Sequence, residues 1–506
     1  MSDKSNPDKS SRTITMIKSI RYIHNLLMFI MTMVFSTLLL SGCISTGQRT
    51  NLPLELPKEF SKRGSGNIEK KWWLDFNDQV LSGLIETALK DNFTLLAAAE
   101  RISEVRALAT KANAALFPSL DGSGSITTGQ NLQAETTTDN FSLDLAALYE
   151  IDLWGRVRAV QQGAILDLKA TEADYDTATI SLAAEMATTW FELVENELQV
   201  ELLKQQRETN KKVLELITTQ FKTGKTNIAD VLQQRQLVES NSGNLAGLRS
   251  KSKLYRHQLA ILLGISPGSK LPETATLPHL SPLPDPGVPI TLISRRPDVR
   301  QSYFLLQAAD SRVAAAVADR LPRLSISAKL STSGEKAGDL FNNWFTNLGA
   351  NLFSPIIDGG KRLAEVERQK AVARQQFYRY GQIILDALGE VETSLTKEEE
   401  LQNIHNSLKI QLQFAEETIG HVGNRYRQGA EDYQRVLLAL LSHQNLEREI
   451  LQSHLQLINN RIALYRSLCG RIPAAIDNPS ETARQTVAEP QIITPINTPI
   501  FTRGSN

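Results

Sequence analysis

The sequence predicts an α+β membrane protein that is internally duplicated and combines very long helices with four short strands in each chain. Three observations lead to this prediction: an N-terminal segment composed like an export signal, matching residues at an offset of about 205 positions, and short segments in which apolar and polar residues alternate. Helices too long for one compact core are expected to pack as antiparallel coiled coils or as staves of a cylinder.

Residues 1–42 have the order of features expected of a lipoprotein signal peptide. A basic region precedes an apolar run at residues 26–40, about 15 residues, which is shorter than the roughly 20 residues of a membrane-spanning helix. Two small residues, the second of them Gly42, precede Cys43, and this order resembles the bacterial lipobox. It predicts cleavage between Gly42 and Cys43 and a covalent lipid on Cys43, with a retained signal anchor as the alternative. Ile44, in place of Asp, favours the outer membrane.

The composition gives no sign of catalysis or of nucleic-acid binding. Lys and Arg balance Asp and Glu at 55 each, so the net charge is zero. The histidines are scattered, and the sequence has no P-loop, no GxSxG motif and no cysteine cluster. We therefore expect no enzyme, no catalytic residue, no metal site and no cofactor apart from the lipid on Cys43. With Cys43 lipidated, Cys469 has no disulfide partner and is expected to be a small buried residue.

Matching residues recur at an offset of about 205 positions at five places along the chain. For example, Gly155-Arg156 matches Gly360-Lys361, and residues 221–224 match residues 426–429. The nearly constant offset indicates a duplication. The expected organisation is a lipid-anchored extended arm at 43–70, a first repeat at 71–281, a Pro-rich linker at 282–290, a second repeat at 291–475 and a disordered tail at 476–506.

Each repeat contains one very long helical stretch and a long return helix. Residues 155–221 and 362–425 contain no Pro and little Gly, and their apolar residues recur at helical spacing. The return helices are expected at 229–263 and 432–468. In the second of these, apolar residues alternate at spacings of four and three, as in a coiled-coil seam: Leu451, Leu455, Ile458, Ile462 and Tyr465.

Short segments with a period of two predict strands. Apolar and polar residues alternate at 141–151 and again at 324–330, as in a membrane barrel strand or in a half-buried soluble sheet. No second apolar run reaches 18 residues, so a membrane crossing would require a β-barrel. Two strand pairs give four strands in each chain, which cannot close a barrel. Several chains would have to share one, and three chains would supply twelve strands.

Two long motifs are the most specific signals in the sequence. Residues 149–158 form the first and include Trp154, Gly155 and Arg156. Residues 293–300 form the second and contain the run Arg295, Arg296, Pro297 and Asp298. The first resembles the strand-to-helix motif, and the second the RRPD motif, of the TolC-like outer-membrane factors, and in particular of their NodT-type efflux lipoprotein branch. Shorter similarities lie at 354–360, which includes Gly359 and Gly360, at 425–429 and at 463–468. The resemblance covers about residues 70–472.

The resemblance implies a homotrimer with a twelve-stranded barrel in the bacterial outer membrane and a long helical tunnel in the periplasm. It implies the exit duct of a tripartite efflux pump, which passively exports small molecules. The partners would be a periplasmic adaptor, an inner-membrane transporter of the RND type and the lipid of the outer membrane. The duct of a type I protein-secretion system is one alternative, and a periplasmic coiled-coil structural or adaptor protein is another.

The residues singled out in these motifs have structural roles by their chemistry. Gly155 and Gly360 would allow a strand to turn into a helix, and Pro297 fits the first turn of a helix. In the family, the turns that end the long helices lie at the tunnel tip, where the adaptor docks. The candidates there are Gly224, Asp230, Gly429, Asp432, Leu437 and Leu438, with the basic Lys222 and Arg427 facing a partner or solvent. Leu438 stands where many relatives have an Asp, so we expect a hydrophobic constriction that involves Leu437 or Leu438. The cargo is not indicated by the sequence.

Overall fold

The computed structural model describes residues 54–64, 71–131, 136–273 and 276–472. The signal peptide, the Gly42–Cys43 cleavage site, the lipid attachment at Cys43 and the tail from 476 lie outside these residues. The described chain divides into two compact units. The sheet unit comprises residues 108–166 and 306–376, and the helical unit comprises the remainder. Each unit contains equivalent segments of both repeats, so neither unit corresponds to one repeat.

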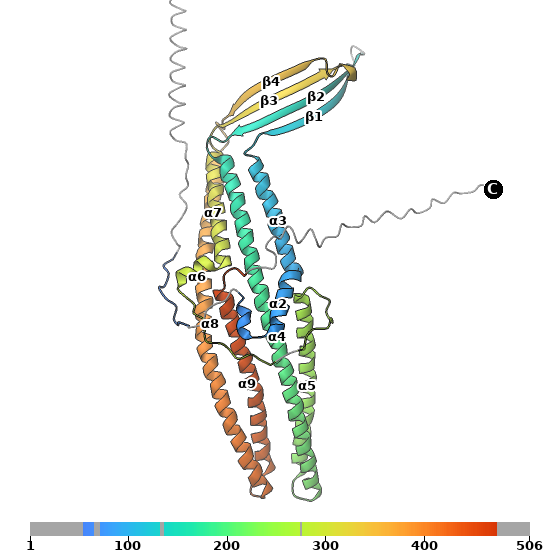
Figure 1. Ribbon diagram of the computed structural model, residues 1–506, viewed down its shortest axis with the longest axis vertical. Coiled ribbons are helices and arrows are strands. Elements are labelled where there is room, and N and C mark those ends of the chain that lie inside the picture. Colours follow the sequence, from blue (N-terminus) through green and yellow to red (C-terminus); the bar gives the residue numbers. More distant parts are fainter. Residues whose placement is uncertain (1–53, 65–70, 132–135, 274–275, 473–506) are drawn as a thin grey trace, which may run out of the picture. The chain divides into compact units, whose positions relative to one another are not determined.

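Four antiparallel strands form one sheet in the order β1-β2-β3-β4 (Figure 1). The strands are β1 (Ser119–Asn131), β2 (Thr136–Ile151), β3 (Arg323–Gly334) and β4 (Trp344–Phe353). The predicted four strands are therefore confirmed, and β2 and β3 are longer than their alternating cores at 141–151 and 324–330 suggested. Within the described residues, β1 and β4 are the edges of the sheet.

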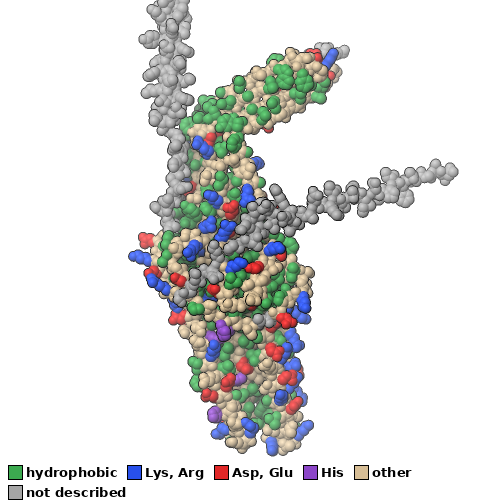
Figure 2. Space-filling model, viewed as in Figure 1, with side chains coloured by type: hydrophobic (Ala, Val, Ile, Leu, Met, Phe, Trp, Pro, Cys, Tyr) green, Lys and Arg blue, Asp and Glu red, His purple; other side chains and the backbone are tan. Residues whose placement is uncertain are grey.

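The two faces of the sheet differ in chemistry, as the alternation predicted. Residues directly opposite one another on neighbouring strands share a face. One face carries the pairs Leu145–Leu330, Ala147–Ala328, Tyr149–Ile326 and Ile151–Leu324, and it continues on β4 with Leu348 and Leu352. Leu145, Ile326, Leu348 and Leu352 of this set are exposed, Leu348 at 83%, and the others are half-buried. Figure 2 shows hydrophobic side chains along the sheet. The opposite face carries mainly hydroxyl, amide and charged side chains, so the chain presents an apolar surface that needs a non-aqueous environment.

Two uninterrupted helices of 67 residues dominate the helical part, α4 (Arg156–Lys222) and α8 (Lys361–Arg427). Each is followed by an antiparallel return helix, α5 (Ile228–Leu262) or α9 (Tyr433–Leu468) (Figure 1). The bounds agree with the predicted helices to within two residues. The other elements are η1 (Trp72–Phe76), α2 (Gln79–Asp91), α3 (Phe93–Ala114), α6 (Pro289–Arg295), α7 (Pro297–Ala318) and η2 (Ala337–Asp339). None of the helices in the described part of the chain is apolar enough over a sufficient length to cross a membrane.

The duplication is confirmed by the element starts. The pairs α3 and α7, β1 and β3, α4 and α8, and α5 and α9 begin 204 or 205 residues apart. The second copy therefore repeats the order of the first: helix, two strands, long helix and return helix.

Aromatic side chains of η1 form the centre of the helical unit's core. Trp72 and Trp73 are fully buried, and the ring of Trp72 stacks on Tyr465 of α9 at a centroid distance of 5.7 Å. The Tyr465 hydroxyl donates a hydrogen bond to Asp75 at 2.6 Å. Further back in the chain, the predicted arm reaches α8, where the Ser61 amide donates to Glu392 at 3.0 Å. Residues 54–64 and η1 thus contribute contacts to the helical unit.

Candidate functional site

The first strand-to-helix junction lies between the end of β2 and the start of α4. Gly155 has a φ of +75°, in the left-handed region that strains residues with a Cβ atom. The Asp152 carboxylate accepts hydrogen bonds from the backbone amides of Val157 and Arg158, both at 3.0 Å, and so caps the first turn of α4. Burial opposes the charge of Asp152, but the hydrogen bonds from Arg158 and Val157 outweigh it and lower the pKa of the carboxyl group.

The two other motif residues at this junction make specific bonds. The Trp154 indole Nε1 donates to the carbonyl oxygen of Pro322 at 2.7 Å. The Arg156 guanidinium binds both carboxylate oxygens of Glu150, at 2.7–3.0 Å. Because Pro322 directly precedes β3, Trp154 joins the end of the first strand pair to the start of the second. A Trp suits this position because its side chain is long and ends in one hydrogen-bond donor, the indole N–H.

The second junction, between β4 and α8, repeats the device. Gly359 and Gly360 have φ values of +62° and +84°. The Asp358 carboxylate accepts hydrogen bonds from the backbone amides of Gly360 at 3.0 Å and Arg362 at 3.3 Å. Both copies therefore use an Asp cap and a left-handed glycine to start the long helix, and the sequence motif identified the glycines but not the caps.

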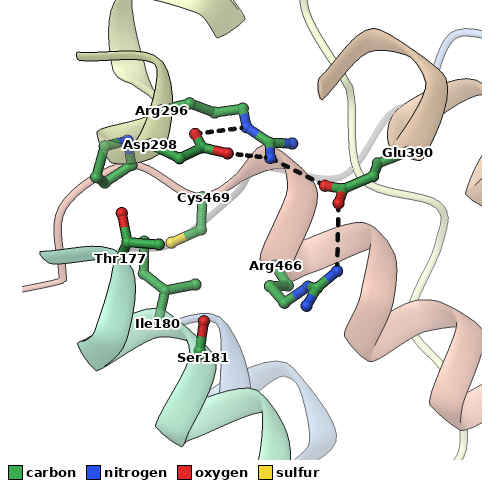
Figure 3. Close-up of a pocket in the computed structure, with 9 residues that line it drawn as sticks. Thr177, Ile180, Ser181, Arg296, Asp298, Glu390, Arg466 and Cys469 are labelled. Carbon is green, nitrogen blue, oxygen red and sulfur yellow. Dashed lines mark hydrogen bonds and ion pairs between the residues drawn. The ribbon is translucent and has the colours of Figure 1, made fainter. Parts of the chain in front are cut away.

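The RRPD motif forms a corner between α6 and α7 and fastens it to two other helices (Figure 3). Arg296 is 8% exposed, and its guanidinium bonds both oxygens of Asp298 at 2.6–3.0 Å. The same group contacts Glu390 of α8 at 2.9 Å and donates to the Ser467 carbonyl of α9 at 3.2 Å. Pro297 occupies the first position of α7, as predicted. Arg295, by contrast, is exposed.

A small cavity of about 100 Å³ lies beside this corner. Its lining includes Arg296, Asp298, Glu390, Arg466 and Cys469, so two guanidinium groups face two carboxylates and no net charge remains (Figure 3). Cys469 is 3% exposed, as expected of a small buried residue, and burial raises the pKa of its thiol to about 11. The thiol is therefore protonated at neutral pH, and the corner is a structural clamp rather than a reactive site.

Each hairpin of long helices ends in the same type of turn. Gly224 and Gly429 both have a φ of +75°. The next residue in each case, Lys225 or Ala430, donates its amide to a carbonyl five residues earlier, at 2.9 Å. This is the hydrogen-bond pattern of a Schellman motif, and the left-handed position favours glycine. Lys222 and Arg427 are exposed beside these turns.

The acids proposed for the tip have different environments. Asp432 is the N-cap of α9, where its Oδ1 accepts from the Arg435 amide at 3.0 Å. Asp230 is half-buried and accepts a hydrogen bond from the Thr226 hydroxyl. Neither is a free carboxylate projecting from the tip, so these positions mainly fix the turns.

Leu437 and Leu438 lie on different faces of α9. Leu437 is 9% exposed and packs with Ile217, Val231 and Tyr433 in an apolar cluster between the two hairpins. Leu438 is 61% exposed. Of the two leucines proposed for a constriction, only Leu438 presents its side chain outside the packing of its own chain. The cluster continues into buried polar contacts, such as the bond from Asn210 Nδ2 to Gln444 Oε1 at 3.1 Å.

Comparison with known proteins gives a consistent match over both repeats. Residues 84–265 and 288–470 match the family described as outer membrane efflux protein. The chain is 29% identical over 458 residues to the pyoverdine export outer membrane protein OpmQ of Pseudomonas aeruginosa, covering 87% of this chain and 96% of that protein. It is 28% identical over 422 residues to nodulation protein T of Rhizobium leguminosarum bv. trifolii, covering 81% and 90%.

A solved structure has the same fold. The outer-membrane channel OprN superposes with a TM-score of 0.78 at 26% identity, covering 84% of this chain and 99% of that chain. The two family matches fall one on each repeat, and they include both long hairpins, both strand pairs and the Arg296 corner. The chain therefore belongs to the outer membrane efflux protein family and is a channel of the outer membrane.

Proposed function

We propose that this chain is the exit duct of a tripartite efflux pump and works as a homotrimer. The observation that supports this best is the sheet with one exposed apolar face, one polar face and two open edges. Open strand edges are not tolerated in lipid, so the edge of β4 needs a partner such as β1 of the next chain. Three chains of four strands would close a twelve-stranded barrel with lipid outside and water inside.

In this proposal the duct performs no chemistry. It provides a water-filled path for small molecules that an inner-membrane transporter of the RND type delivers through a periplasmic adaptor. The exposed hairpin turns with Lys222 and Arg427 are the candidate contacts for the adaptor. A lipid on Cys43 would add an anchor to the outer membrane. The name of the relative OpmQ refers to pyoverdine export. For this chain we propose a small molecule as the cargo.

Leu438 is the proposed narrowest hydrophobic point of the tunnel. Three copies would form an apolar ring at the tip, which would lack the carboxylates that bind cations. Adding divalent cations to single channels of the purified protein is therefore expected to leave the current nearly unchanged. Strong block by these ions would count against Leu438 as the constriction and would point to an acidic ring.

The assembly is tested by native mass spectrometry and by cross-linking in cells. The purified full chain is expected to run as a trimer and to conduct ions in planar bilayers. A tagged copy is expected to capture a periplasmic adaptor together with an RND transporter. Capture of an ATP-driven exporter with its adaptor would favour the secretion duct, and a monomer without conductance would favour a structural rod.

A further inference from the structure

The polar face of the sheet carries charge at its middle, in two adjacent rows of side chains. One row runs across the strands from Asp121 through Ala146 and Lys329 to Asn347. The next row contains Asp144 of β2. Lys329 Nζ lies 3.0 Å from Asp144 Oδ1 across these rows. We call Asp121, Asp144 and Lys329 the girdle.

The girdle is isolated from other charges on that face. Toward the far end of the sheet the polar face continues with hydroxyl and amide side chains, such as Ser142, Asn140 and Ser333. Toward the helices, the next charged residues are Glu150, which Arg156 binds, and Arg323, which contacts Asp319. Asp121 makes no ion pair with any residue that the structure describes, so it is the charge of the girdle that is not compensated.

Stability does not account for the girdle. The side chains of Asp144 and Lys329 are 26% and 50% exposed, and ion pairs with this exposure contribute little to folding. Serine and asparagine fill most of the remaining polar face, and at these positions they would be hydrated equally well. The charges act instead on ions in the water in front of them, since the field of a fixed charge extends over about 10 Å at 0.1 M salt.

We infer that the girdle sets the charge selectivity of the duct, and that Lys329 limits its preference for cations by neutralising Asp144. This inference rests on the proposed trimeric barrel, in which the polar face lines the lumen. Two carboxylates and one ammonium leave one negative charge in each chain, and three chains would repeat it around the wall. The wild-type barrel is therefore mildly cation-selective and still admits organic anions, whereas uncovering Asp144 doubles the net negative charge.

Reversal potentials of the purified full-length protein in planar bilayers test this inference. In a KCl gradient near 0.01 M, where the Debye length is about 30 Å, Lys329→Gln is expected to raise the cation-to-anion permeability ratio about twenty-fold, as for three unit charges, one in each chain, at about 10 Å in water. Asp144→Asn is expected to lower the ratio by a similar factor. The double substitution is expected to return it to the wild-type value, because it removes one charge of each sign.

Two controls separate charge from shape. Lys336→Gln removes an exposed lysine from the connection between β3 and β4, outside the two rows, and is expected to change the ratio much less than Lys329→Gln does. At about 1 M salt, where the Debye length is about 3 Å, the differences between variants should vanish. Channels whose ratio is the same in all variants at low salt, or whose differences persist at high salt, would overturn the girdle while leaving the duct intact. A wild-type protein that forms no channel would instead refute the proposed duct.

Discussion

Replacing Arg296 by Met should destabilise the helical unit strongly, whereas the same change at its neighbour Arg295 should not. Removing one partner of a buried ion pair costs about 3–5 kcal/mol. The side chains of Asp298 and Glu390 are 29% and 40% exposed, so water can partly replace the lost guanidinium. We therefore expect the lower end, about 3 kcal/mol. At about 2 °C per kcal/mol for a unit of this size, the Tm should fall by about 6 °C.

Thermal unfolding of the detergent-solubilised protein, followed by far-UV circular dichroism, measures this shift. Arg295→Met is the matched control, because the residue type and the apolar replacement are the same and the side chain is exposed. Arg296→Lys should fall between the two, since it keeps the charge but loses the fork that binds Asp298, Glu390 and the Ser467 carbonyl together. Equal Tm values for the Arg296 and Arg295 variants would refute the clamp.

Three further predictions concern other parts of the chain. Gly155→Ala should cost about 1–2 kcal/mol because of the φ of +75°, whereas Gly389→Ala, within α8 and with open space for a Cβ atom, should gain about 0.5–1 kcal/mol; thermal unfolding compares them. Burial lowers the pKa of His405 and of His454, so below about pH 6.5 the unfolded state binds more protons than the folded state. The Tm should therefore fall as the pH drops below about 6.5, and it should stop falling once the pH is below the pKa values of the folded state. Replacing both histidines by Gln should flatten this profile. Cys43→Ala, exported with a cleavable signal, should still form the trimer and transport its cargo, with at most a partial loss of transport activity. Loss of the folded trimer on native gels would show that the lipid is essential.

The sequence predicted the elements that depend on local pattern. A long stretch without Pro and with helical periodicity is sufficient for α4 and α8, and alternation is sufficient for β2 and β3. β1 gave a weaker pattern because Gly122 and Gly124 occupy its apolar-face positions and leave no side chain to alternate. The structure explains Gly124: a Cβ atom there would lie 3.1 Å from the Leu143 side chain, so the glycine makes room for its neighbour.

Contacts between distant parts of the chain could not be predicted in the same way. The RRPD motif identified Arg296 but not its partners, because Glu390 and Ser467 lie on other helices, far away in the chain, and only the packing of those helices brings them to Arg296. The Asp144–Lys329 pair was equally hidden, since it depends on the register between β2 and β3. A one-residue change of that register would place the lysine on the apolar face.

The two return helices show how far the repeat alone decides which leucine faces outward. Their N-caps are equivalent, since in each helix the cap side chain accepts a hydrogen bond from the amide three residues further on, at 3.0 Å. At the offset of 205 residues Leu438 matches Gln233, and both side chains are exposed. Leu437 matches Leu232, but Leu437 is 9% exposed whereas Leu232 is 54% exposed. The duplication therefore already places Leu438 on the outside of its helix, whereas the burial of Leu437 depends on contacts of α9 that its counterpart in α5 does not share.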